Sequence, residues 1–212
     1  TPITFNYLKL LSSEIIRNER SSTIFDIINL NILEMLGVRF IINNKVLDKE
    51  NLNFVTKIEN ELEEIFLYEI NNFLSFKNPT KIIYANSIKT TNKILLSKEF
   101  NPDNEIIIHD KKIDLTDKNL KKLEKFSFKI NKNYLLTKGS AKNKTLVVLP
   151  YQFSYCFISK YKNLIFPVNG GLLGIMYDRN LDDEIYYKQS LMNNFTCAIK
   201  DFLFFKKINS NF

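Results

Sequence analysis

The fold is decided by residues 144–177, which read KTLVVLPYQFSYCFISKYKNLIFPVNGGLLGIMY. This stretch holds three of the five glycines and two of the five prolines of the chain. Between these breakers lie short apolar runs at residues 145–149, 155–158, 164–168 and 172–177. Short runs rich in Val, Ile, Phe and Tyr favour strands, and Asn169-Gly170-Gly171 can supply the positive φ angles of a tight reversal. We therefore predict the centre of an antiparallel sheet here, without a catalytic motif.

Helices and strands are expected to alternate before this stretch. Apolar side chains recur at helical spacing in residues 5–18 and 24–36, which predicts two amphipathic helices. Ser22 or Thr23 is the expected N-cap of the second helix, and Gly37 is its expected left-handed C-terminal cap. Further along, we expect a short helix at residues 90–97 and strands at residues 38–42, 81–84 and 105–109.

Residues 52–70 allow two interpretations. Residues 53–58 and 66–70 can form two paired strands around an acidic turn, whose carboxylates are expected to be solvated rather than catalytic. A single helix over residues 55–68 is the alternative, because Glu and Leu are good helix formers. We prefer the two strands.

The remainder of the chain is expected to be mainly β. Strands are expected at residues 126–130, 134–136 and 184–187, a turn is expected at residues 139–144, and residues 191–208 fit either a strand or a helix. The whole pattern predicts an α+β fold, with a small α/β half at residues 1–119 and an antiparallel β-sandwich-like half at residues 120–212. Four side chains of the central stretch are expected to share a core: Tyr155, Phe157, Ile165 and Leu173.

The composition limits the classes of function. With 212 residues, 45% of them hydrophobic, the chain can bury a sizeable core. Its net charge of +7 favours anionic partners such as nucleic acid, phospholipid head groups or lipid diphosphates, although lysines that only keep the surface solvated would give the same charge. The basic residues are scattered without a known nucleic-acid-binding pattern, so a nucleic-acid-binding protein is the alternative function and not the preferred one.

Residues that could support catalysis or metal binding are scarce. Cys156 and Cys197 are the two cysteines, and they can form one disulfide; a buried free thiol at Cys156 within a strand is the preferred interpretation. His109 is the single histidine and is expected to end a strand. The motifs of serine hydrolases, zinc proteases and P-loop enzymes are absent from the sequence. We therefore expect no catalytic residue, no metal and no cofactor in this segment.

No apolar run in the sequence has the length of a membrane span, and the first residues, TPITFNYLKL, lack both a signal-peptide pattern and an initiator Met. We expect the chain to be a segment of a longer protein.

The order of motifs resembles a known family. A strand ending in Leu149-Pro150 is followed by aromatic residues, a hairpin with Lys160 and Lys162 at its tip, and then PVNGGLLGI at residues 167–175. This order is similar to the extracytoplasmic domain that follows the membrane helices in YfhO-like bacterial membrane proteins, which are related to membrane glycosyltransferases that use lipid-linked sugars. Earlier matches are LGVRFII at residues 36–42, LYEINN at residues 67–72 and FNP at residues 100–102. The Gly-Trp pair usual in that family is replaced here by SYCF at residues 154–157, and the chain has no Trp.

The resemblance implies an accessory domain at the extracytoplasmic face of the cell membrane, which helps to place a glycan or lipid-linked sugar for a membrane domain of the same polypeptide. The family's catalytic acid lies in a membrane-domain loop outside this chain, so no catalysis is expected from this segment alone. Aromatic side chains can stack on sugars, and the candidates are Tyr151, Tyr155, Tyr161 and Tyr177. The candidates for contact with anionic lipid head groups are Lys160, Lys162, Lys206 and Lys207.

Overall fold

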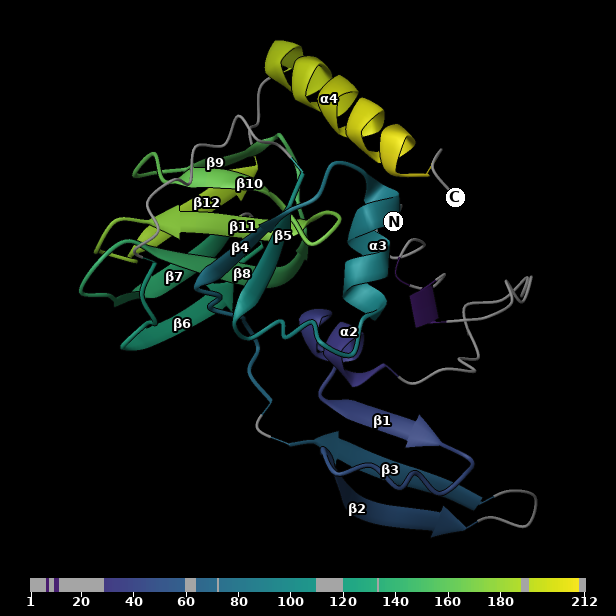
Figure 1. Cartoon of the computed structure of the whole chain (residues 1–212). Helices are drawn as coiled ribbons and strands as arrows, with labels where there is room; N and C mark the ends of the chain where they lie inside the picture. Colours follow the sequence, from purple (N-terminus) through teal and green to yellow (C-terminus); the bar gives the residue numbers. More distant parts are fainter. Residues whose placement is uncertain are drawn as a thin grey trace.

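The computed structural model describes residues 7, 10–11, 29–59, 64–71, 73–109, 120–132, 134–187 and 191–209. In this part of the chain the fold is α+β, and antiparallel sheets predominate, as the sequence predicts. Figure 1 shows two packed sheets with helices beside them, a small sheet at one end of the molecule and a long helix at the other.

A three-stranded antiparallel sheet in the order β10-β11-β8 lies at the centre. Its strands are β8 (Thr145–Gln152), β10 (Leu164–Val168) and β11 (Leu172–Tyr177). Successive side chains of a strand point to opposite faces. Leu146 and Val148 of β8 accordingly enter one hydrophobic core, while Val147 and Leu149 enter a second. Because both faces of the sheet are buried, its strands have unbroken apolar sequences instead of alternating ones.

A second antiparallel sheet covers one face of the central sheet and completes a sandwich. Its order is β6-β7-β12-β9, formed by β6 (Lys125–Ile130), β7 (Tyr134–Ser140), β9 (Phe157–Ser159) and β12 (Asp183–Tyr187). Leu173 is buried between the sheets, and Phe157 and Ile165 pack against the same cluster, as predicted. The prediction for Tyr155 is wrong, because this residue lies in the turn before β9 and its side chain is 43% exposed.

The other face of the central sheet is covered by a mixed layer. It contains α2 (Leu30–Met35), α3 (Ile88–Leu96) and the parallel pair β4 (Lys81–Tyr84) and β5 (Glu105–Ile108). Tyr7, Leu10 and Leu11 are helical and buried in this core, whereas the rest of the helix expected at residues 5–18 lies outside the described residues. The same core takes in Val168 and Phe205, so residues on both sides of the expected boundary at 119/120 contribute to it. The two-part division itself stays a prediction.

The sequence predicted the C-terminal cap of α2 correctly and its N-terminal cap incorrectly. Asn29 is the N-cap of α2, and its side chain accepts a hydrogen bond from the backbone N–H of Ile32. The prediction that Ser22 or Thr23 caps this helix is therefore wrong; both residues lie outside the described ranges. Gly37, with φ of 74°, ends the helix as expected. The N–H groups of Gly37 and Val38 donate to the carbonyls of Glu34 and Leu33, which is the Schellman arrangement.

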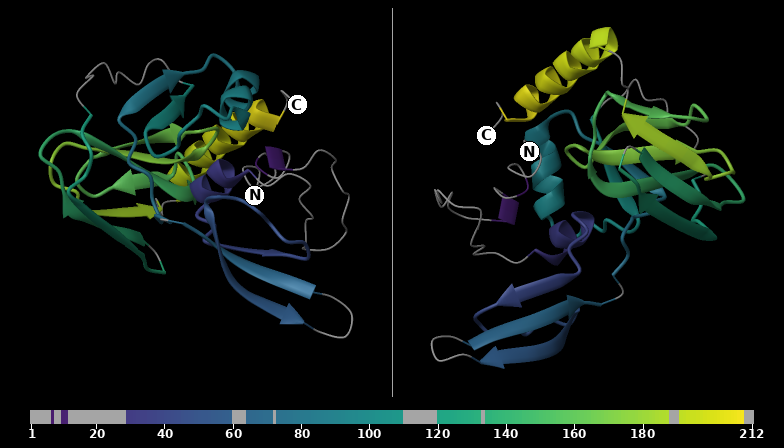
Figure 2. Two further views of the ribbon diagram at one scale, coloured as in Figure 1. Left: turned by 60° about the horizontal axis from the view of Figure 1, so that its bottom comes forward. Right: turned by 180° about the vertical axis from the view of Figure 1, so that it is seen from behind.

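Residues 52–70 form two strands, as preferred from the sequence. β2 (Leu52–Glu59) and β3 (Glu64–Ile70) pair in antiparallel register, and β1 (Phe40–Asn43) pairs with the other edge of β3. The acidic turn at residues 60–63 lies outside the described residues. Figures 1 and 2 show that this sheet projects from the body at the end opposite the C-terminal helix.

Two expectations for the second half need correction, and one open alternative is resolved. The segment expected to be a hairpin around Lys160 and Lys162 does not pair with itself, because β9 joins the covering sheet through β12 while β10 joins the central sheet. The turn expected at residues 139–144 is shorter, because Gly139 and Ser140 extend β7. Residues 191–208, which fitted either a strand or a helix, fall within α4 (Leu191–Asn209).

Asn169 joins the central sheet to the mixed layer. The turn at Asn169-Gly170-Gly171 has positive φ angles at all three residues, as predicted. The buried Asn169 side chain accepts a hydrogen bond from the backbone N–H of Ile107 at 2.8 Å, and the backbone N–H of Asn169 donates to the carbonyl of Ile107 at 2.8 Å. The hydroxyl of Tyr7 donates to its carbonyl. The Asn169 side chain thus replaces a missing strand partner for β5.

We expect Asn169→Gly to lower the free energy of unfolding by about 1–3 kcal/mol, because the buried N–H of Ile107 loses its acceptor. Asn169→Ala should lower it by a further ~1–2 kcal/mol, because alanine also disfavours the positive φ. Urea unfolding of the three proteins measures both differences. Equal stability of Asn169→Gly and the original protein would contradict the role of the side-chain amide.

A disulfide bond links α4 to the sandwich. Cys156 and Cys197 are bonded, with their Cα atoms 5.2 Å apart, so the preferred free thiol is wrong. Cys156 also lies in a turn and not within a strand. Beside the disulfide, Asp201 of α4 accepts hydrogen bonds from the Ser154 hydroxyl at 2.6 Å and the Tyr155 N–H at 2.7 Å. The turn at residues 154–156 therefore holds the helix by covalent and polar bonds together.

Unreduced protein that is unfolded and alkylated should show no alkylated cysteine by mass spectrometry, and reduced protein should show two. The double variant Cys156→Ser/Cys197→Ser should unfold with a free energy lower by about 2–4 kcal/mol, because the bond closes a loop of 41 residues in the unfolded chain. Alkylation of both cysteines before reduction would contradict the bond.

Candidate functional site

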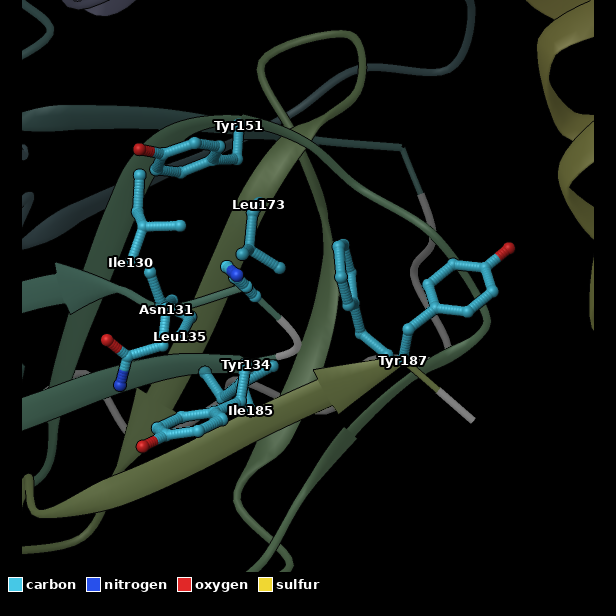
Figure 3. Close-up of a pocket in the computed structure, with 10 residues that line it drawn as sticks. Ile130, Asn131, Tyr134, Leu135, Tyr151, Leu173, Ile185 and Tyr187 are labelled. Atoms are coloured by element: carbon cyan, nitrogen blue, oxygen red, sulfur yellow. The ribbon is translucent and has the colours of Figure 1, made fainter. Parts of the chain in front are cut away.

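A pocket of about 300 Å³ opens between the two sheets of the sandwich. Figure 3 shows strands of both sheets contributing side chains to it. Its lining is mostly aromatic and aliphatic and consists of Ile130, Asn131, Lys132, Tyr134, Leu135, Tyr151, Phe157, Leu173, Ile185 and Tyr187.

The strand pattern explains why Tyr151 lies in this pocket. Val147, Leu149 and Tyr151 are alternate residues of β8, so all three face the covering sheet. The first two are buried beneath that sheet, whereas Tyr151 lies near the end of β8, where the β6–β7 turn leaves it partly uncovered. Its ring meets Phe128 edge-on, with 6.1 Å between the centroids. This contact fixes the plane of the Tyr151 ring at the pocket wall.

Aromatic side chains form opposite sides of the pocket. In Figure 3 the rings of Tyr151 and Tyr134 lie on either side of the opening, and both hydroxyls turn toward the same end. Phe157 and Tyr187 meet edge-to-face at 5.9 Å, and the hydroxyl of Tyr187 points away from the pocket. The pocket can therefore present ring faces and edges to a flat ligand from more than one direction.

A few polar groups accompany these rings. Asn131 and Lys132 belong to the β6–β7 turn, which the hydrogen bond from the Asn131 N–H to the Tyr134 carbonyl closes at 2.9 Å. Burial raises the pKa of the Tyr151 hydroxyl, so this group remains protonated and able to donate at neutral pH. An amide, an ammonium and two phenols thus supply donors and acceptors around an apolar floor.

The structure does not bring the four predicted tyrosines together. Only Tyr151 lines the pocket. Tyr177 is fully buried and its hydroxyl bonds to that of Thr137, so the expectation that it contacts a sugar is wrong. Tyr155 packs against Phe204 of α4. Tyr161 is 63% exposed but lies in the corner between β9 and β10.

Sequence reasoning missed Tyr134, Phe157 and Tyr187 as pocket residues. The register places Tyr187 opposite Phe157, and Tyr134 opposite the neighbouring Tyr186. The aromatic residues that end β12 and begin β7 and β9 were the available signal. Their meeting depends on the pairing of β12 with both neighbours, which the sequence does not reveal.

The predicted lysines come from two separate elements. Lys160 forms an ion pair with Glu184 at 2.8 Å, which offsets its charge, and Lys162 occupies a left-handed position in the same corner with φ of 61°. Asp183 fixes this corner by accepting bonds from Ser159 at 2.6 Å and from Asn163 at 2.8 Å. Lys206 and Lys207 are exposed on the last turns of α4.

The side chain of His109 is hydrogen-bonded to α3. Its Nε2 lies 3.0 Å from the hydroxyl of Thr91, which is fully buried in α3. Burial lowers the pKa of His109, and the positive charge of Lys207 lowers it further. Among the described residues, no three His, Cys, Asp or Glu side chains are grouped so that they could hold a metal ion.

The chain matches no protein-family profile, no curated protein and no solved structure. Within the described ranges, no helix combines the length and apolar character needed to cross a bilayer.

The lowered pKa of His109 predicts a pH dependence of stability. Below pH 6.5, the ordinary value for histidine, the unfolded chain takes up a proton that the folded chain does not, so stability falls as the pH falls. Above that pH the difference disappears. His109→Gln should flatten the dependence of the unfolding free energy between pH 7 and about pH 5, a range that lies above the ordinary pKa of carboxylates. An unchanged slope in the variant would contradict a His109 that stays neutral because it is partly buried.

Proposed function

We propose that this chain is an accessory domain that binds a saccharide in the pocket around Tyr151. The observation that carries the proposal is the convergence of four aromatic rings with Asn131 and Lys132 on one opening between the sheets. Ligand pockets are typically apolar and aromatic with a few placed polar groups. Sugar rings fit such a lining, because they offer apolar C–H faces to aromatic rings and hydroxyls to the polar groups.

The size of the pocket limits the ligand. A volume of about 300 Å³ is at the small end of the range for small-molecule pockets, which is roughly 300–1,000 Å³. The opening therefore favours a single sugar ring or a short saccharide over a long polymer. A positive charge at Lys132 on its rim suits a saccharide that carries a phosphate, such as the head group of a lipid-linked sugar.

The wider setting that we propose is the extracytoplasmic face of a bacterial membrane. The disulfide between Cys156 and Cys197 supports this, because stable disulfides belong to oxidising compartments. In this proposal, the domain places the sugar and a membrane domain of the same polypeptide carries out glycosyl transfer. The resemblance to YfhO-like proteins supports the assignment to a membrane glycosyltransferase-like protein.

The alternative of nucleic-acid binding has less support. Arg39, Lys57 and Lys81 form ion pairs with neighbouring glutamates, and Lys77 is buried between Glu34 and Asp103. These four basic side chains are already engaged with carboxylates, so they are less available for contact with a phosphate backbone.

Saccharide binding is tested by saturation-transfer NMR with glucose, galactose, mannose and N-acetylglucosamine and their 1-phosphates. We expect at least one of these probes to bind. For that probe, Tyr187→Ala should weaken binding about fivefold, because a ring at the pocket edge contributes on the order of 1 kcal/mol. Tyr151→Phe should also weaken it, because the donor is lost while the packing against Phe128 is kept.

The matched control is Tyr161→Ala, which removes an exposed tyrosine outside the pocket. This variant should bind as the original protein does. Equal weakening by Tyr161→Ala and Tyr187→Ala, or no binding of any probe, would contradict the proposed site.

A further inference from the structure

The long C-terminal helix α4 presents two different faces. One face is turned toward the rest of the domain. On this face Cys197 is bonded to Cys156, and Asp201 accepts hydrogen bonds from the turn at residues 154–156. Phe205 on the same face is 5% exposed and lies in the core between the central sheet and the mixed layer. Phe204 beside it packs edge-on against Phe153. These contacts fix the rotation of the helix about its axis, and so they also fix which side chains point outward.

The outward face carries a stripe of large apolar side chains. Phe195, Ile199, Phe202 and Leu203 are 71%, 43%, 65% and 57% exposed. Their spacing of four, three and one residues places them along one side of an α-helix. Figures 1 and 2 show α4 at an outer end of the molecule, with the sheets on one side of it only. No described residue covers this stripe, as the exposures show.

Folding of the domain does not explain the stripe. A helix that only needed to pack through Cys197, Phe204 and Phe205 would carry polar residues on its other side. Clustered, exposed aromatic and aliphatic side chains mark surfaces that meet another apolar phase. The stripe is also held rigidly, because the disulfide and Asp201 secure the helix behind it.

The charge of α4 indicates which surface it meets. Its only acidic residue is Asp201, and this carboxylate is turned inward to Ser154 and the N–H of Tyr155. Lys200, Lys206 and Lys207 are exposed on the same helix. The outward side is therefore apolar with positive charges only, which matches the acyl chains and phosphates of an anionic bilayer.

We propose that α4 lies flat in the interface of a membrane containing anionic phospholipid, with Phe195, Ile199, Phe202 and Leu203 among the acyl chains and the lysines at the head groups. A second copy of the chain is a less suitable partner, because helix pairing across this face would bring two sets of lysines together. The proposal does not depend on the saccharide pocket. If both hold, α4 orients that pocket relative to the membrane surface.

The absence of Trp from the chain makes a direct test available. Phe202→Trp places a single Trp on the stripe, and Ile42→Trp places one on the projecting sheet, where Ile42 is 72% exposed. Fluorescence of the full chain is measured with vesicles of phosphatidylcholine alone and with 30% phosphatidylglycerol. With the anionic vesicles, the emission of Phe202→Trp should shift to the blue and be quenched by brominated acyl chains, and that of Ile42→Trp should not.

Two further variants test the contributions of apolar contact and charge. Phe195→Ser/Phe202→Ser should reduce co-flotation with anionic vesicles at least tenfold, whereas Ile42→Ser/Ile58→Ser, which removes exposed apolar residues from the projecting sheet, should leave it unchanged. Lys200→Gln/Lys206→Gln should lower binding to anionic vesicles more than to neutral ones. Circular dichroism verifies that each variant is folded.

Three outcomes would overturn the proposal. One is the absence of a spectral shift with either vesicle, and another is an equal shift for both Trp positions. The third is a blue-shifted Phe202→Trp without vesicles, accompanied by a dimer in size-exclusion chromatography, which would assign the stripe to a second copy. Saccharide binding measured without vesicles is unaffected by any of them, so the two proposals fail independently.

Discussion

The hydrogen bonds between Asn169 and Ile107 are the joint on which the arrangement of layers depends. β5 pairs with β4 on one side, and its other side meets the turn after β10, where no strand continues. The carboxamide of Asn169 satisfies the backbone group of Ile107 that would otherwise be buried without a partner. A side chain thereby extends the hydrogen-bonded layer across a point where the backbone reverses.

A second polar joint lies at the far edge of the central sheet. Lys77 is 4% exposed, its backbone pairs with Val148 of β8, and its ammonium lies 2.8 Å from carboxylates of both Glu34 and Asp103. The ammonium connects α2 to the loop before β5. Removing Lys77 would be destabilising, because the largely buried carboxylate of Glu34 would be left without its partner. Together with the Asn169 bonds, these ion pairs link the central sheet to the mixed layer at two separate points.

The sequence was most informative where local chemistry decides structure. Strands β8, β10 and β11 were recognisable from short apolar runs between Gly and Pro, and Gly37 from the requirement for a left-handed residue. The sequence was least informative about which strands pair with one another when they are distant in the chain. Asp183 of β12 accepts a hydrogen bond from Ser159, next to the pairing of β9 with β12 that separates β9 from β10. The two residues are far apart in the sequence, so no local pattern predicts this contact. The aromatic pocket and the pairing of Cys156 with Cys197 also depend on contacts between residues that are distant in the chain. Tyr177 shows that an aromatic residue in a strand can lie in the hydrophobic core instead of at a binding surface.

The disulfide also makes the later part of the chain a closed ring. Between Cys156 and Cys197 the polypeptide passes through β9, β10, β11 and β12 before returning to its starting point. A protease that cuts once within this ring cannot release a fragment, because the two ends stay linked through sulfur. In an environment rich in proteases, a single nick would leave the sandwich and α4 covalently connected, and only a nick combined with reduction would separate them.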